Sequence, residues 1–150
     1  MKLAEEEALY PLDAVRQTLE SLPQFQELGI RIVEVVRGVC VAQLDPSPRL
    51  AGNPETGVVH GGVVTTLLDS VGGAAAFSVV RRGQSVATLD LRIDYLRMSD
   101  PRRAIFGRAE CYRLSRSVAF VRGIAYCEER EPMAHCAATF MIGSVGFSIQ

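Results

Sequence analysis

Hydrophobic and polar residues alternate strictly between residues 87 and 96. Leu89, Leu91, Ile93 and Tyr95 fall on one face of such a segment, and Thr88 falls with the charged residues on the other. This period of two predicts a half-buried β-strand. Similar segments, joined by short polar turns, predict three more strands. They span residues 104–112, 118–128 and 133–142.

The first half of the chain predicts helices followed by a hairpin. Apolar residues at helical spacing predict a helix over residues 12–20. Pro23 suits the first turn of a second, short helix, and Gly29 suits its end. β-Branched residues then predict strands over residues 30–36 and 39–45, with a tight turn between them. A loop rich in proline and glycine follows this hairpin.

Residues 61–80 predict one long helix that is apolar nearly all round. Such a helix lies at the centre of a fold rather than on its surface. The segment is rich in valine and glycine, which are poor helix formers, so burial must stabilise it. The predicted class is therefore α+β, with an antiparallel sheet wrapped around one central helix. Because a sheet covers only one side of that helix, we expect a second subunit.

Length and composition are those of one globular domain. The chain has 150 residues, of which 48% are hydrophobic and 22% are charged. These values predict a single domain over residues 1–150, with a helical extension over about residues 1–29. The formal net charge is −1, so the chain lacks the basic surface that binds nucleic acid or an anionic membrane.

No segment predicts a targeting signal or a membrane span. The N-terminus is acidic and lacks an apolar region. The apolar stretch over residues 57–80 is interrupted by His60, Asp69 and two Gly-Gly pairs. The four cysteines form no C-x-x-C pair, and no histidine lies at zinc-binding spacing from them. We therefore expect a soluble cytoplasmic protein with free thiols and no bound metal.

Two glycines, Gly61 and Gly62, open the long predicted helix. The first backbone N–H groups of a helix have no acceptor within it, and glycine lets a ligand or another backbone come close. Such N–H groups are natural donors to an oxyanion that develops during a reaction. The alternative is that the glycines serve only packing at the helix start.

Asp69 is the second unusual residue of this helix, because it is the only carboxylate between Glu55 and Asp90. Burying a lone carboxylate costs on the order of several kcal/mol unless it is paired or solvated. A residue that breaks the pattern of an otherwise consistent element is expected at a functional site. The alternative is a structural aspartate that bonds neighbouring backbone.

Gly61 and Asp69 cannot act on one group from the same chain. They lie eight residues apart, and at ~1.5 Å rise per residue this is ~12 Å along a helix. A reacting carbonyl needs each contact within about 3 Å. If both residues serve one reaction, they come from two chains whose helices run antiparallel across a dimer interface.

A known family shares the motif that runs from residue 53 to residue 69. The motif is N-x-x-x-G-x-x-H-G-G-x-x-x-x-x-x-D, and the strand that begins at Ala87 follows it. It resembles the PaaI-type branch of the hotdog-fold acyl-CoA thioesterases, over about residues 25–143. The resemblance implies a hotdog fold, and homodimers or homotetramers with active sites at the subunit interface.

The resemblance also implies roles for single residues. The Gly61 N–H polarises the thioester carbonyl, and Asp69 of the facing subunit is the nucleophile or general base. Asn53 positions the substrate or the attacking water, and Thr88 helps to hold that water. Strand alternation, however, places Thr88 on the face that points away from the helix.

The remaining candidates surround this catalytic group. His60 shapes the loop and the helix start by the resemblance, with proton transfer as the alternative. Gly62, Arg116 and Ser117 are candidate substrate-binding residues. A guanidinium pairs well with phosphate oxygens such as those of coenzyme A. The alternative for Arg116 is a solvated hairpin turn.

We therefore expect a thioesterase that hydrolyses acyl-CoA, with an aromatic or medium-chain acyl group, to a carboxylate and a free thiol. Coenzyme A enters only as part of the substrate, and no metal or redox cofactor is expected. The G-x-S-x-G motif of serine hydrolases and the D-x-x-x-x-H segment of hotdog hydratases are absent. The alternative function is a non-catalytic acyl-CoA-binding module or regulator on the same fold. The sequence does not choose between coenzyme A and an acyl-carrier protein.

Overall fold

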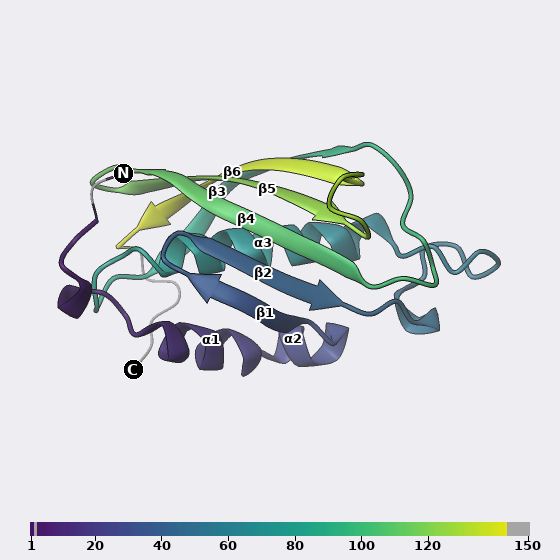
Figure 1. The fold of residues 1–150 in the computed structure, drawn as a ribbon, viewed down its shortest axis with the longest axis horizontal. Coiled ribbons are helices and arrows are strands. Elements are labelled where there is room, and N and C mark those ends of the chain that lie inside the picture. Colours follow the sequence, from purple (N-terminus) through teal and green to yellow (C-terminus); the bar gives the residue numbers. More distant parts are fainter. Residues whose placement is uncertain (2, 144–150) are drawn as a thin grey trace.

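The computed structural model describes residue 1 and residues 3–143. Within these residues, six strands form one antiparallel sheet in the order β1-β2-β4-β5-β6-β3, and α3 (Gly61–Phe77) runs along one face of it (Figure 1). The strands are β1 (Arg31–Val36), β2 (Val39–Leu44), β3 (Val86–Tyr95), β4 (Ile105–Leu114), β5 (Val118–Tyr126) and β6 (Ala134–Ile142). The other helices are η1 (Glu6–Ala8), α1 (Leu12–Glu20), α2 (Pro23–Leu28) and η2 (Pro48–Leu50). The predicted α+β arrangement is confirmed.

The helices α1 and α2 precede the sheet, as predicted, and lie along the β1 side of it (Figure 1). Pro23 stands in the first turn of α2. Gly29 ends that helix with a φ of 69°, a left-handed conformation that glycine adopts without steric cost. Val15, Leu19 and Phe25 are buried, so the helices join the main core rather than lying apart from it.

The helix α3 is shorter than its sequence predicts. The prediction that it continues to residue 80 is wrong, because it ends at Phe77. The buried Ser78 hydroxyl donates to the Ala75 carbonyl at 2.8 Å and accepts from the Gly38 N–H at 2.8 Å. Ser78 therefore closes the helix and ties its end to the turn between β1 and β2.

The helix is apolar over most of its surface, as predicted, but its two sides differ in how far they are covered. Leu67, Leu68 and Val71 are buried in the core. Gly61 is exposed and Asp69 is half-buried. The polar residues of α3 therefore lie along its less covered side.

A β-bulge interrupts β3 near its start. The register of β3 with β6 shifts between Thr88 and Asp90, which leaves Leu89 as an extra residue. A one-residue bulge reverses the alternation of side chains along the strand. The prediction that Leu89 shares a face with Leu91 and Ile93 is therefore wrong: Leu89 is 54% exposed, whereas Leu91 and Ile93 pack against the core.

The strands β1 and β3 form the edges of the sheet in the described residues. On β1, Arg16 of α1 donates to the Ile32 carbonyl at 3.0 Å and to the Val33 carbonyl at 3.2 Å. Glu20 accepts from the Ile32 N–H at 3.1 Å. These bonds occupy backbone groups that an edge strand otherwise offers to another chain. Among residues 3–143, no side chain bonds the backbone of β3 in this way.

The cysteines Cys40, Cys111, Cys127 and Cys136 are free thiols, as predicted. In the part of the chain that the structure describes, no helix is both long and apolar enough to cross a membrane. No three histidine, cysteine, aspartate or glutamate side chains of residues 3–143 are grouped so that they could hold a metal ion.

Candidate active site

His60 caps the N-terminus of α3. It stands at the N-cap position in an extended conformation, and its Nδ1 accepts a hydrogen bond of 2.9 Å from the Gly62 N–H. Such a cap satisfies one of the donors that a helix start leaves unpaired. In this geometry His60 shapes the helix start, and its Nδ1 is not available to take a proton from substrate while the cap is in place.

The Gly61 N–H donates to no atom of the described residues, although its neighbours are all engaged. The His60 N–H bonds the Leu50 carbonyl at 2.8 Å, and the Val63 N–H bonds the His60 carbonyl at 2.9 Å. The Gly62 N–H is held by the cap. An exposed, unengaged donor therefore stands at the positive end of the α3 dipole, where it suits an anion or a polarised carbonyl.

Gly61 and Gly62 are glycines for different reasons. A Cβ on Gly62 would lie 3.0 Å from His60 Nδ1, so close packing against the cap accounts for this glycine. A Cβ on Gly61 would meet nothing nearer than the Tyr95 ring at 3.6 Å, which is an ordinary contact. Neither residue has a positive φ. Packing within the described residues therefore accounts for Gly62 but not for Gly61.

Tyr95 braces the first turn of α3, a role that the sequence did not suggest. Its hydroxyl donates to the Gly61 carbonyl at 2.7 Å and lies 2.6 Å from Thr65 Oγ1. Thr65 Oγ1 also donates to the Gly61 carbonyl, at 3.1 Å. These bonds hold the residue whose N–H is the candidate donor. A donor that is already held in place stabilises developing charge without reorganisation. The alternation of side chains along β3 turns Tyr95 toward the helix. The position of Tyr95 next to Gly61 depends on the register of β3 in the folded sheet.

Asp69 is held by a side chain from β3. Thr88 Oγ1 donates to Asp69 Oδ1 at 2.9 Å. The bulge turns Thr88 toward α3, so the sequence prediction that Thr88 points away from the helix is wrong. The partner of Asp69 among the described residues is a hydroxyl and not the backbone, which argues against a purely structural aspartate. Asp69 Oδ2 accepts no hydrogen bond from the described residues and can face a water molecule.

Asn53 lies in the exposed loop between β2 and α3. Its Oδ1 accepts from the Glu55 N–H at 2.9 Å, and its carbonyl accepts from the Gly57 N–H at 2.9 Å. A bridge between Ala51 and Val59 leads the loop back to α3. The Asn53 side-chain NH2 donates to no described atom, so it is a donor available to a ligand.

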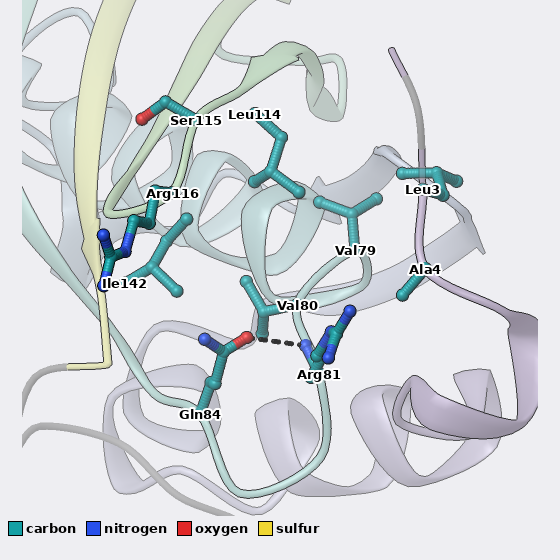
Figure 2. A pocket seen from close by; sticks show the side chains of 10 residues that line it. All are labelled: Leu3, Ala4, Val79, Val80, Arg81, Gln84, Leu114, Ser115, Arg116 and Ile142. Carbon is teal, nitrogen blue, oxygen red and sulfur yellow. Dashed lines mark hydrogen bonds between the residues drawn. The ribbon is translucent and has the colours of Figure 1, made fainter.

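Arg116 and Ser117 lie in the turn between β4 and β5. Arg116 and Arg81 line a pocket of about 480 Å³, and Figure 2 shows their side chains on different sides of it. Neither guanidinium has a carboxylate partner among the described residues. This pocket also contains Val79, which follows the end of α3. Because α3 has 17 residues and is about 25 Å long, one chain does not bring Arg116 or Ser117 to Gly61.

Another pocket, of about 200 Å³, opens beside Asp69 and Thr88. Its apolar walls come from α1, α2, the junction between them, α3, β3 and β6. They include Leu19, Leu22, Phe25, Phe77 and Phe140. The apolar spacing over residues 12–20 predicted that Leu19 turns inward, but nothing in the sequence indicated that any of these side chains faces Asp69.

The buried thiols are not nucleophiles at neutral pH. Loss of hydration raises the pKa of Cys40 to about 12, and the pKa values of Cys111 and Cys136 to about 11. A thiol attacks as its thiolate, and these groups stay protonated. The Asp69 carboxylate is therefore a better candidate for the reactive group than these three thiols.

Comparison with known proteins places this chain in a family. Residues 56–134 match the family model of the thioesterase superfamily. A solved protein from Pseudomonas aeruginosa is 39% identical, with a TM-score of 0.78 over 87% of this chain and 98% of that one. An antiparallel sheet along one long helix, taken with these matches, defines a thioester hydrolase of the hotdog fold. The chain belongs to the thioesterase superfamily.

More distant relatives have more specific names. The medium/long-chain acyl-CoA thioesterase YigI of Salmonella typhimurium is 25% identical over 135 residues, which are 81% of this chain and 86% of that protein. A phenylacetic acid degradation-related protein from Ralstonia eutropha has a solved structure. It is 25% identical, with a TM-score of 0.73 over 85% of this chain and 98% of that one. These matches agree with the hotdog fold expected from the sequence.

Proposed function

We propose that the chain hydrolyses acyl-CoA thioesters, and that Asp69 of one subunit and the Gly61 N–H of a second subunit act on the same carbonyl. One observation carries this proposal. An exposed backbone donor with no partner among the described residues stands at the start of α3, and the same helix carries a half-buried carboxylate oriented by Thr88. Together these groups supply what hydrolysis of an already activated thioester requires.

The hydrolysis has two routes. As a general base, Asp69 takes a proton from water while the water oxygen bonds to the thioester carbon. The oxyanion accepts from the Gly61 N–H, the C–S bond then breaks, and the leaving thiolate takes up a proton. As a nucleophile, Asp69 instead attacks the thioester carbon and expels the thiolate, which takes up a proton. The anhydride formed is then hydrolysed by water to the acid and the free Asp69 carboxylate. Both routes yield a carboxylic acid and a free thiol, and neither requires a metal or a redox cofactor.

The proposed site needs two subunits because α3 separates its two halves. Gly61 and Asp69 both lie on α3, ~12 Å apart along its axis. The edge strand β3 suits pairing with a second copy, since no described side chain covers its backbone as α1 covers that of β1. Antiparallel packing of two α3 helices then brings each Asp69 toward the Gly61 of the other subunit, in a homodimer or a homotetramer.

The basic pocket at the end of α3 suits the phosphates of coenzyme A. Arg116 and Arg81 line it without a carboxylate partner among the described residues. In an antiparallel dimer, this end of α3 lies on the same side as Gly61 of the other subunit. We place the nucleotide part of the substrate there, with Ser117 beside it, and the thioester near Gly62 and Asn53. The Asn53 amide is a donor for the carbonyl or for the attacking water.

The names of the relatives support coenzyme A over an acyl-carrier protein. One relative is named a medium/long-chain acyl-CoA thioesterase, and another is named for phenylacetic acid degradation. Both names suit a substrate whose acyl group is apolar.

A thiol-release assay tests the proposal. Wild-type protein and Asp69→Asn are incubated with acetyl-, hexanoyl-, phenylacetyl- and palmitoyl-CoA, and free thiol is measured with a thiol-reactive dye. We expect the wild type to release thiol and Asp69→Asn to be impaired. If the wild type binds acyl-CoA by calorimetry but releases no thiol from any of the four, the proposal is wrong and the chain is a binding module.

A further inference from the structure

The pocket beside Asp69 brings the carboxylate of the proposed site against apolar side chains. It has a volume of about 200 Å³. Asp69, Ser70 and Thr88 supply its polar residues. Leu19, Leu22 and Phe25 line it from the N-terminal helices, while Phe77 and Phe140 line it from α3 and β6.

We propose that this pocket receives the acyl group, and that the junction of α1 and α2, through Leu22, limits how long that group can be. This inference rests on the proposed thioesterase function. An attacking carboxylate or its water must come within about 3 Å of the thioester carbon. The acyl substituent is bonded to that carbon, so it begins beside Asp69, where the pocket opens.

The size of the pocket indicates the class of acyl group. An apolar cavity of about 150 Å³ accommodates a benzene ring, and this pocket is somewhat larger. It therefore fits one aromatic ring or a medium-length aliphatic chain. A long aliphatic chain would extend beyond it, past Leu22.

The charge of the pocket adds a second selectivity. Asp69 is the only ionisable residue among those that line it in the described structure. A second carboxylate at the far end of the acyl group would lie among phenylalanine and leucine side chains and near Asp69. Both effects disfavour it, so the pocket selects uncharged acyl groups.

Substitution of Leu22 tests whether the junction of α1 and α2 limits the length of the acyl group. Leu19 and Phe25 are buried, with exposures of 6% and 2%, so truncating either would damage the core. Leu22 is half-buried and packs at the edge of the core. Leu28 is also half-buried at the edge of the core, but it lines a different pocket, and so it provides a matched control.

Whereas truncating Leu22 widens the pocket, a larger residue at Gly73 of α3 narrows it. Gly73 lines the same pocket, and an added Cβ would lie 3.5 Å from Phe140 Cε1, an ordinary contact. Alanine is also the better helix former. Gly73→Ala therefore narrows the pocket without disturbing the fold.

The experiment compares kcat/KM across an acyl-CoA series for the wild type, Leu22→Ala, Gly73→Ala and Leu28→Ala. We expect Leu22→Ala to raise the ratio of palmitoyl-CoA to hexanoyl-CoA activity by about tenfold. Gly73→Ala should lower phenylacetyl-CoA activity by about tenfold and spare acetyl-CoA. Leu28→Ala should leave the profile unchanged. Succinyl-CoA should be a poorer wild-type substrate than butyryl-CoA, which has the same number of acyl carbons.

The outcomes separate this inference from the proposed function. If the wild type hydrolyses acyl-CoA but Leu22→Ala and Gly73→Ala both keep its acyl profile, the pocket does not hold the acyl group and only this inference fails. If the wild type hydrolyses none of the series, the proposed function fails with it. A folded state for each variant is verified by its melting temperature.

Discussion

Thr88 donates a hydrogen bond of 2.9 Å to Asp69 Oδ1 across the space between β3 and α3. The bond exists because the bulge at Leu89 reverses the alternation of β3 just after Thr88. Without the bulge, a strand whose Leu91 and Ile93 face the helix would turn Thr88 away from it. The same irregularity thus serves the core and the candidate site. We expect the following consequences.

Asp69→Asn should keep the fold and lose most of the activity. The two side chains are nearly isosteric, but an amide cannot take a proton from water and is a poor nucleophile. General-base catalysis contributes about 10²–10⁴-fold, so kcat should fall within that range while KM changes little. Steady-state thiol release measures both, with melting temperature as the control. Near wild-type turnover in Asp69→Asn would remove Asp69 from the mechanism.

Thr88→Val should lower kcat by about tenfold, because it removes a hydrogen bond to a charged group and lets the Asp69 carboxylate rotate. Thr18→Val is the matched control, since among the described residues the Thr18 hydroxyl bonds only the Ala14 carbonyl within α1. Equal kinetics in the two variants would show that Thr88 does not orient Asp69.

Gly61→Pro should abolish the oxyanion donor while preserving the helix. Proline is favoured at the first helical position, and the preceding residue, His60, has a ψ of 135°, which a following proline tolerates. Loss of one oxyanion donor costs about 10²–10³-fold in kcat. Gly61→Ala adds a Cβ but keeps the N–H, so it should retain clearly more activity. A lower kcat for Gly61→Ala than for Gly61→Pro would mean that catalysis requires open space at Gly61 rather than its N–H.

Two inactive variants should restore one another if the site is shared between subunits. In a dimer formed from Asp69→Asn and Gly61→Pro chains, one site carries both changes and the other carries neither. Random pairing of equal amounts makes half of the dimers mixed, so coexpression should recover about one quarter of wild-type activity. Absence of recovery, with mixed dimers demonstrated by mass spectrometry, would place both residues in one chain.

The free energy of unfolding should decline on the alkaline side. Burial raises the pKa of Cys40 to about 12, and the pKa values of Cys111 and Cys136 to about 11, from an ordinary value of 9.0. A pKa raised by folding stabilises the folded state fully below the unfolded value. That stability is lost as the pH rises from about 9 toward 11 and 12. Urea unfolding at pH 8 and pH 10.5 measures the decline, and Cys40→Ala should make it shallower. A flat profile would contradict the burial of these thiols.

The local sequence was sufficient to predict most helices and strands of the fold, but not the end of α3 or the bulge in β3. Strand alternation, the apolar spacing of α1, Pro23 and Gly29 act within a few residues, so they could be recognised without knowledge of the rest of the chain. The same holds for the unusual features of α3, since two glycines at a helix start and one carboxylate in an apolar helix are visible in the sequence itself. The family model matches residues 56–134, which contain the part of the motif from Gly57 to Asp69.

Only the tertiary structure decided what these residues touch. The bulge that turns Thr88 to Asp69, the Ser78 hydroxyl that ends α3, and the Tyr95 hydroxyl that braces Gly61 all depend on the register between segments distant in sequence. The difference between Gly61 and Gly62 became visible only through the atoms around each one. Periodicity shows which face of an element is apolar, but the partner of that face is set by packing the whole chain. For this reason Leu19, within the apolar spacing of α1, could be predicted to face the core, while its place in the pocket beside Asp69 could not.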